Sequence, residues 1–441
     1  MHDFDQLVRP DEGLISPKIY SEQDIYEREL EQVFGRSWLY LAHESQLPDA
    51  GSFLQTYMAE DPVLVVRQRD GAVKAFLNQC RHRGMRICRT DEGKAKVFTC
   101  TYHGWSYGLG GELINVPEEE RAYRNEIDKD KWGATRVPRV SIYRGFIFAT
   151  WDDEAPDLEE YLGGMARYFD GFADRYDGGL EMVPGATKWV IDCNWKFAAE
   201  QACSDMYHVP VSHASAVVAL VPPEHPELMP NIGGPGRQFG GNGHGSGSYW
   251  QDDIGKDLSF GGPPFGEWVE QNKQSIYDRI GEERAHKVWA HNTIFPNFSY
   301  LQQQATIRVY HPRGANQIEV WAWTYVPKNA PDKVKEAIRI ANVRTFTPAG
   351  VFETDDGENW PEIQQVMRGW KARQTMFNAQ QGLGHEERDA HGLPGVTNDV
   401  YSETAARGFY RRWAQLMKGM SWKEILEADR LEETKVKAVS S

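Results

Sequence analysis

The chain of 441 residues is long enough for two or three domains, and its 40% hydrophobic content supports a full core. Its formal net charge of −15 argues against a nucleic-acid partner, because phosphate binding requires a basic surface. No apolar run is long enough to cross a membrane and the first residues lack a secretory signal, so we expect a cytoplasmic protein with no membrane partner.

The first third of the chain predicts one helix followed by a small β domain. Residues 17–36 have the spacing of an amphipathic helix, and from Trp38 the pattern changes to short β-like runs. The pair Asp70-Gly71 is a strong hairpin signal between two of these runs. We therefore expect a β domain over residues 38–155.

The rest of the chain mixes helices and strands. A helix is predicted over 157–176, and a later segment passes from strand-like to helical, with Pro210 expected to end the helix near His208. The region 222–265 is rich in Gly and Pro and predicts a long mobile loop, in which we expect His244 to be solvated. Two strands, 305–314 and 317–327, precede helices predicted at 331–344, 357–372, 401–418 and 421–430.

The cysteines indicate metal binding rather than disulfides, since the chain has an odd number of them and no export signal. Cys80 lies two positions before His82, and Cys100 lies three positions before His103. The remaining cysteines have no metal-binding spacing: Cys88, Cys193 and Cys203.

These two mixed halves favour an iron–sulfur cluster over zinc. Zinc takes two cysteines and two histidines, but generally from C-x2-4-C and H-x3-5-H halves. In a Rieske [2Fe-2S] centre, two histidines replace two cysteines on one iron. Two loops that each supply one cysteine and one histidine can give both thiolates to one iron and both imidazoles to the other. The sequence therefore predicts a Rieske cluster.

A second group of metal-binding residues lies in "EQACSDMYHVPVSH". Asp205 and His208 are expected on one helix face, and His213 can turn back toward the same point beyond Pro210. Two imidazoles and one carboxylate form the facial triad of non-haem Fe(II) oxygenases. The carboxylate could be Asp205 or a member of the Asp355-Asp356 pair, although that pair could instead simply cap the helix predicted at 357–372.

The segments "CRHRGMRIC" and "FTCTYHGW", with "NWKFAAEQACSDMYH", "HPRGANQIEVWAW" and "AGVFETDDGENW", carry a resemblance that runs over nearly the whole chain. The chain resembles the large (α) subunit of Rieske non-haem iron aromatic-ring-hydroxylating dioxygenases, nearest to the biphenyl, toluene and polycyclic-aromatic branch. The resemblance implies an α+β fold. A small all-β Rieske [2Fe-2S] domain (38–155) would be inserted in a catalytic domain (1–37 plus 156–441), whose antiparallel sheet is surrounded by helices in a helix-grip arrangement.

The resemblance also implies roles for single residues and partners. It makes Asp356 the third iron ligand, with Asp355 as the alternative, and makes Asp205 a bridge from His208 to the cluster ligand His103 of a neighbouring subunit. The implied assembly is an α3β3 hexamer with a β subunit, although α3 relatives exist. A ferredoxin and an NAD(P)H-dependent reductase would supply electrons, and O2 would be the co-substrate. No G-x-G-x-x-G fingerprint follows a strand, so we expect no NADH site on this chain.

The implied substrate pocket is mostly apolar, and its expected lining residues are Gln201, Ala202, Met206, Val209, His291, Leu301, Phe346 and Phe352. Any of these could instead be ordinary core residues. His291 could equally be a buried structural histidine, and His311 is expected to be structural.

No arginine stands out among these positions, although an aromatic carboxylate would require a cation. We therefore expect a neutral substrate such as naphthalene, biphenyl or dibenzofuran, giving a cis-dihydrodiol or an angular diol. The alternatives are dioxygenation or monooxygenation of a phthalate or salicylate, and, in other classes, a Rieske electron carrier without oxygenase activity, a zinc hydrolase or a structural zinc protein.

Overall fold

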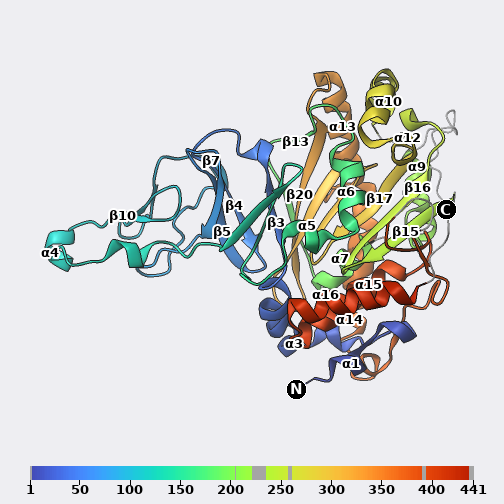
Figure 1. The fold of residues 1–441 in the computed structure, drawn as a ribbon, viewed down its shortest axis with the longest axis horizontal. Helices are drawn as coiled ribbons and strands as arrows, with labels where there is room; N and C mark the ends of the chain where they lie inside the picture. The colour runs from blue at the N-terminus through green and yellow to red at the C-terminus, as the bar shows by residue number, and fades with distance from the viewer. Residues whose placement is uncertain (1, 204, 221–234, 257–260, 390–393, 437–441) are drawn as a thin grey trace. The chain divides into compact units, whose positions relative to one another are not determined.

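The structure is a computed structural model that describes residues 2–203, 205–220, 235–256, 261–389 and 394–436 (Figure 1). The chain divides into two compact units, Phe34–Leu158 and Met1–Val33 with Glu159–Ser441. All pairings between the described strands are antiparallel, and helices accompany the largest sheet, so the α+β class is confirmed. None of the helices in the described part of the chain combines the length and apolar character needed to cross a bilayer.

The smaller unit is built almost entirely of short strands. They are β3 (Leu39–His43), β4 (Ser52–Met58), β5 (Asp61–Arg67), β6 (Val73–Leu77), β7 (Glu92–Lys94), β8 (Phe98–Thr99), β9 (Ser106–Tyr107), β10 (Leu113–Asn115), β11 (Arg139–Tyr143) and β12 (Phe146–Thr150). They form the sheets β6-β5-β4-β7, β10-β9-β8 and β11-β12-β3. Short helical turns lie between them: η3 (Glu44–Gln46), α4 (Glu119–Tyr123) and η4 (Lys129–Trp132).

The hairpin predicted at Asp70-Gly71 is confirmed. It joins β5 to β6, which pair in antiparallel register. The Asp70 carboxylate accepts a hydrogen bond from the Ala72 amide, and Gly71 has a φ of +88°, a conformation that favours glycine.

A ten-stranded sheet forms the centre of the larger unit. Its strands are β13 (Leu180–Met182), β14 (Thr187–Ile191), β15 (Gly236–Gly241), β16 (His244–Trp250), β17 (Lys287–Ile294), β18 (Phe298–Leu301), β19 (Thr306–Pro312), β20 (Ile318–Pro327), β22 (Glu387–Arg388) and β23 (Val396–Asp399). The order is β13-β20-β19-β18-β17-β16-β15-β23-β22, and β14 also pairs with β20. A separate small sheet joins β1 (Val8–Arg9), β2 (Leu14–Ile15) and β21 (Phe377–Asn378).

Helices cover this sheet and surround its ends (Figure 1). They are α1 (Phe4–Leu7), η1 (Pro10–Glu12), α2 (Lys18–Ser21), α3 (Gln23–Glu29), η2 (Leu30–Phe34), α5 (Leu158–Leu162), α6 (Met165–Ala173), α7 (Trp195–Gln201), α8 (Val209–Ser212), α9 (Ala214–Leu220), η6 (Ile254–Lys256), α10 (Gly262–Gln271), α11 (Lys273–Ile280), α12 (Glu282–Ala285), α13 (Asp332–Thr345), α14 (Val351–Val366), η7 (Ala372–Gln374), α15 (Thr404–Met417) and α16 (Trp422–Lys435). Helix α15 packs on β15 and β16, α6 packs on β16, and α7 packs on β17 and β19.

The long loop predicted over 222–265 is wrong for the described part of that region. Residues 221–234 and 257–260 lie outside the described residues, but β15 and β16 form a hairpin between them. The glycines serve close packing, because a Cβ on Gly240 would meet the Ala405 Cα of α15 at 2.8 Å and one on Gly245 would meet the Cys203 carbonyl oxygen at 2.1 Å.

Several predicted helices also differ from those observed. The helix expected over 17–36 is divided into α2, α3 and the π-helical turn η2, since Glu22 is extended. The helix expected over 157–176 is interrupted between α5 and α6 by Gly163, which has a φ of +50°. The predictions at 331–344, 401–418 and 421–430 correspond to α13, α15 and α16.

Two corrections affect the residues expected to bind metal. Helix α7 ends at Gln201, so Asp205 and His208 do not share a helix, and Pro210 lies in the first turn of α8 instead of ending a helix. Proline is well suited to that position because the first helical amides have no intrahelical acceptor. Helix α14 begins at Val351, so the Asp355-Asp356 pair lies inside a helix rather than before one.

Candidate metal centres

Two matching turns in the smaller unit present the Cys-His pairs. The Cys80 carbonyl oxygen accepts a hydrogen bond from the Gly84 amide at 2.9 Å, and the Cys100 carbonyl oxygen accepts one from the Gly104 amide at 2.9 Å. Both glycines have a φ of +75°. Because a residue with a side chain rarely adopts this conformation, glycine allows each turn to close tightly and present its cysteine and histidine in the same way.

The thiols and imidazoles of these turns have different surroundings. The Cys80 and Cys100 side chains are buried, whereas His103 is exposed and its ring centroid lies 4.5 Å from that of His82. The Trp105 indole stacks on the His82 ring, and the Tyr107 hydroxyl donates to the Cys80 sulfur at 3.3 Å. A hydrogen bond to a ligand sulfur is one of the means by which a protein tunes a cluster.

These four side chains do not converge on one point, as a zinc site would require. Among the described residues, the one set of three or more Cys, His, Asp or Glu ligand atoms within 4.8 Å of one another lies in the larger unit. The Nδ1 atom of His82, in the smaller unit, is buried and has no hydrogen-bond partner among the residues that the structure describes. Two thiols and two imidazoles presented by separate turns therefore suit a two-iron cluster better than a single ion.

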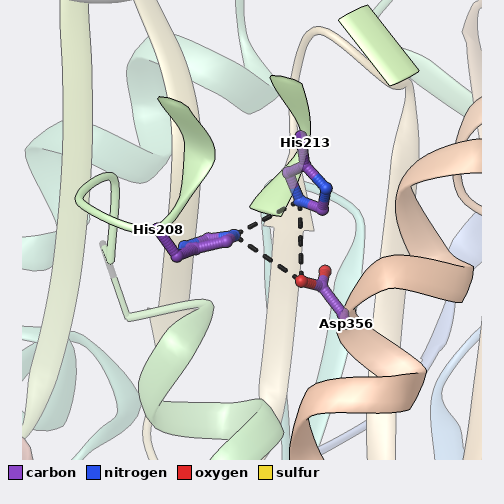
Figure 2. A group of neighbouring side chains, drawn as sticks. All are labelled: His208, His213 and Asp356. Atoms are coloured by element: carbon purple, nitrogen blue, oxygen red, sulfur yellow. Dashed lines mark hydrogen bonds and ion pairs between the residues drawn. The ribbon is translucent and has the colours of Figure 1, made fainter. Parts of the chain in front are cut away.

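The set in the larger unit consists of His208, His213 and Asp356, whose side chains point toward one another in Figure 2. The two Nε2 atoms are 3.3 Å apart, and Asp356 Oδ1 lies 3.6 Å from His208 Nε2 and 3.5 Å from His213 Nε2. His208 precedes α8, His213 follows it, and Asp356 comes from α14. His213 and Asp356 are almost fully buried.

The outer nitrogens of both rings face other carboxylates. His208 Nδ1 lies 3.3 Å from Asp205 Oδ2, and His213 Nδ1 lies 3.0 Å from Asp355 Oδ2. A carboxylate at Nδ1 favours the proton on that nitrogen, so each Nε2 presents a lone pair to the centre of the set. Asp355, the alternative third ligand, therefore lies on the outer side of His213, away from that centre.

The centre of the set has the character of a cation site. Two lone pairs and a carboxylate oxygen at these spacings repel one another unless a cation lies between them. The buried Asp356 Oδ1 has no hydrogen-bond partner among the described residues. Two imidazoles and one carboxylate are the donor set of a non-haem Fe(II) site, so these residues fit such an ion.

The charges around His208 also indicate a carboxylate-oriented imidazole. Burial alone lowers the pKa of His208, but the hydrogen bond and charge of Asp205, together with the charge of Asp356, outweigh burial and raise it. Burial raises the pKa of Asp205, but the hydrogen bond and charge of His208 outweigh that effect and lower it. The Asp205 side chain is 34% exposed, so the structure leaves one edge of this carboxylate open to solvent.

Five of the residues predicted to line a pocket lie in two buried apolar clusters: Met206, Val209, Leu301, Phe346 and Phe352. Met206 and Val209 pack with Tyr249, Ala290 and Val400. The second cluster, which reaches the His213 ring through Phe352 at 4.9 Å between ring centroids, is formed by Ala216, Val217, Leu301, Phe346 and Phe352. Ala202 is also buried.

The other histidines singled out from the sequence are all buried. The His291 ring lies 5.6 Å from that of His208, and burial lowers the pKa of His291 to about 3. His311 packs against Trp321 in the sheet. The expectation for His244 was wrong, because this residue is fully buried and hydrogen-bonds to the Tyr161 carbonyl oxygen at 2.8 Å.

Sequence reasoning missed Trp360, Asp355 as a partner of His213, and Arg308. The Trp360 indole donates to Gln201 Oε1 at 2.8 Å, and Arg308 packs over the Phe346 ring while pairing with Glu353. A helix that begins at Val351 would have placed Phe352, Asp356 and Trp360 on one face, four residues apart.

Comparisons with known proteins agree with both centres. Residues 37–138 match the Rieske [2Fe-2S] domain, and residues 165–419 match the ring hydroxylating alpha subunit (catalytic domain). The chain is 50% identical over 427 residues to the biphenyl 2,3-dioxygenase subunit alpha of Rhodococcus jostii (strain RHA1), covering 95% of this chain and 92% of that protein. It is 47% identical to the benzene 1,2-dioxygenase subunit alpha of Pseudomonas putida, covering 97% of this chain and 96% of that protein.

A solved structure of naphthalene 1,2-dioxygenase with indole bound in the active site has the same fold. It superposes with a TM-score of 0.90 at 33% identity and covers 99% of both chains. The chain therefore belongs to the family of Rieske non-haem iron ring-hydroxylating dioxygenases, as an alpha subunit. It is an oxidoreductase whose two domains are those of a [2Fe-2S] cluster and a non-haem iron centre.

Proposed function

We propose that this chain is the terminal oxygenase subunit that adds both atoms of O2 to the ring of a neutral aromatic compound, giving a cis-dihydrodiol or an angular diol. The observation that carries the proposal is the meeting of His208 Nε2, His213 Nε2 and Asp356 Oδ1 beside buried apolar clusters. A facial set of three ligands leaves coordination positions open for O2 and places substrate beside them.

Each metal ligand has a defined part in this proposal. Cys80, His82, Cys100 and His103 would hold the [2Fe-2S] cluster, and His208, His213 and Asp356 would hold the mononuclear iron. The bound metals would supply electron transfer and O2 activation, while the protein orients the ring and excludes water. Addition of both oxygen atoms to the ring consumes two electrons, which NAD(P)H supplies through its reductase, and two protons, one released by NAD(P)H and one taken from solution.

Asp205 has a separate role, because its carboxylate accepts a hydrogen bond from the His208 amide and lies beside the His208 ring, and its open edge can face another chain. It would join His208 to His103 of the partner subunit and carry electrons between chains. This role requires a ring of at least three alpha subunits, and we propose an α3β3 hexamer with a β subunit.

The proposed enzyme has two domains and takes its electrons from partner proteins. Residues 38–155 would form the cluster domain, and 1–37 with 156–441 the catalytic domain. The [2Fe-2S] cluster would receive electrons from a ferredoxin, itself reduced by an NAD(P)H-dependent reductase. Such a chain of donors, with all five cysteines free of disulfides, suits the cytoplasm.

The surroundings of the predicted pocket support a neutral substrate. Leu301, Phe346 and Phe352 are apolar, and the charge of Arg308, which lies against Phe346, is balanced by Glu353. An aromatic carboxylate would require a cation free to bind it. The relatives are named for biphenyl, benzene and naphthalene, all neutral hydrocarbons. Gln201, Ala202, Met206, Val209 and His291 would complete the pocket.

Product analysis tests this proposal. The purified holoenzyme would be reduced through a ferredoxin and reductase pair in air, with biphenyl, naphthalene and dibenzofuran in one set and phthalate and salicylate in the other. We expect diols from the neutral set only, and loss of these products in His213→Ala. Products from the carboxylates alone would contradict the neutral-substrate assignment.

A further inference from the structure

Gln201 places its side-chain amide beside the proposed iron site. It is the last residue of α7, and its Nε2 atom lies 3.4 Å from His208 Nε2. The two other atoms that face His208 Nε2 are His213 Nε2 at 3.3 Å and Asp356 Oδ1 at 3.6 Å. The amide of Gln201 is thus as near to this nitrogen as the proposed ligand atoms are, although Gln201 is not itself a proposed iron ligand.

Trp360 determines which end of this amide faces the site. Its indole Nε1 lies 2.8 Å from Gln201 Oε1, and an indole N–H can only donate a hydrogen bond. The amide oxygen must therefore face Trp360, and the amide nitrogen must face His208. The indole donor thereby removes the usual ambiguity between the oxygen and nitrogen of a glutamine side chain.

The orientation matters because the two ends of an amide differ as metal ligands. Amide oxygens coordinate hard cations, whereas the amide nitrogen carries two hydrogens and has no lone pair available. If the amide turned over, its oxygen would lie among the atoms around His208 Nε2 and could occupy a position that O2 requires.

We propose that Trp360 is a positioning residue that holds the Gln201 oxygen away from the iron and so keeps one coordination position open. Trp360 lies four residues after Asp356 on α14. The same helix face therefore carries the proposed iron ligand Asp356 and the indole that keeps the Gln201 oxygen off the iron. Trp360 is 4% exposed, so the donor side of this hydrogen bond is buried. This inference rests on the iron site assigned under the proposed function.

The test measures the affinity for Fe(II) separately from turnover. The holoprotein, with its cluster intact, would be stripped of mononuclear iron by a chelator and titrated with Fe(II). Trp360→Phe removes the indole N–H and keeps an aromatic ring. We expect it to bind Fe(II) roughly tenfold more tightly and to turn over roughly tenfold more slowly, the scale of effect typical of residues that orient metal ligands.

Three further variants separate this role from structural damage. Gln201→Leu has no amide oxygen, so adding Trp360→Phe to it should leave Fe(II) affinity unchanged. Gln201→Glu should bind Fe(II) more tightly than wild type even with Trp360 present, because one carboxylate oxygen remains free to face the site. Trp38→Phe removes another buried indole N–H, the donor to the Pro156 carbonyl oxygen in the smaller unit, and should leave Fe(II) affinity unchanged.

The outcomes distinguish this inference from the proposed function. Unchanged or weaker Fe(II) binding in Trp360→Phe, or the same change in the Gln201→Leu background, would overturn the role of Trp360 while the iron site stood. If Trp360→Phe does not fold, the test rests on Gln201→Glu. Fe(II) binding by this variant that is weaker than, or equal to, that of wild type would then overturn the inference. Equal binding by wild type and His213→Ala would instead overturn the iron site, and the inference with it.

Discussion

Asp355 and Asp356 are adjacent in sequence but face different atoms of the same site. Consecutive residues on a helix point about 100° apart, so Asp356 reaches the Nε2 atoms while Asp355 reaches the Nδ1 atom of His213. The pair could be found from the sequence, but the division of roles depends on the helix phase. The helix begins at Val351, a start that residue spacing did not reveal, so spacing alone could not tell which of the two acids faces the Nε2 atoms.

His244 illustrates how a single residue can be misjudged from its neighbours. Its Nδ1 accepts from the Phe295 amide at 2.9 Å, so its Nε2 must carry the proton donated to Tyr161, and the ring is held neutral. Burial lowers the pKa of His244 from 6.5 to about 3. The surrounding glycines indicated a solvated loop, and nothing local indicated the two backbone partners.

We expect His244 to make folding stability depend on pH. Between about pH 3 and 6.5 the unfolded chain binds a proton at this residue that the folded chain does not, so the stability falls as the pH falls through this range. His244→Gln removes this proton, so the slope of the free energy of unfolding against pH should fall by about 1.4 kcal/mol per pH unit. Urea denaturation from about pH 5 to about pH 8 measures the slope.

The control for this measurement lies within the same titration. Above about pH 7 His244 is neutral in both the folded and the unfolded chain. The free energies of unfolding of wild type and His244→Gln should therefore change in parallel with pH in that range. Parallel curves below pH 6.5 as well would show that this residue does not bind an extra proton on unfolding.

Among the helices and strands, the β15–β16 hairpin and the start of α14 differ from what their local sequence indicates. Strands β15 and β16 were missed because glycine usually indicates a loop, whereas here it lets α15 approach the sheet. The start of helix α14 was predicted six residues too late, at 357 instead of Val351, because two acidic residues resemble a helix cap. For β15 and β16, tertiary packing, which lies outside any local window, decided the outcome, while regular strands such as β19 and β20 were predicted correctly.

Helix α14 is fixed to the sheet by a buried ion pair. Arg308 of β19 donates to Glu353 Oε2 of α14 at 2.5 Å, and the Trp189 indole of β14 donates to Glu353 Oε1 at 3.0 Å. Burial raises the pKa of Glu353 to about 7, although Arg308 lowers it. Arg308→Met would leave this carboxylate without its cation, and we expect it to lower the free energy of unfolding by about 3 kcal/mol, measured by urea denaturation.

The double variant Arg308→Met/Glu353→Leu is the matched control. Because it removes both charges together, we expect it to recover most of the lost stability. Equal stability of wild type and Arg308→Met would mean that this pair does not fix α14, and equal losses in the single and double variants would mean that packing rather than charge is responsible.

At the scale of the whole molecule, the two centres differ in how far the sequence could define them. Local spacing was enough for the cluster turns, since each pairs a cysteine with a histidine two or three positions later. The iron site instead joins a segment around α8 to α14, far along the chain. Its third ligand could be named only through the resemblance to a family, because the contact is formed by the fold.

The incorporation of labelled oxygen tests the account of the whole molecule most directly. The holoenzyme would turn over biphenyl or naphthalene with its electron donors under ¹⁸O2 in unlabelled water, and the product would be analysed by mass spectrometry. We predict a diol in which both oxygen atoms carry the label. A product with one labelled oxygen, or none, would contradict dioxygenation by this chain.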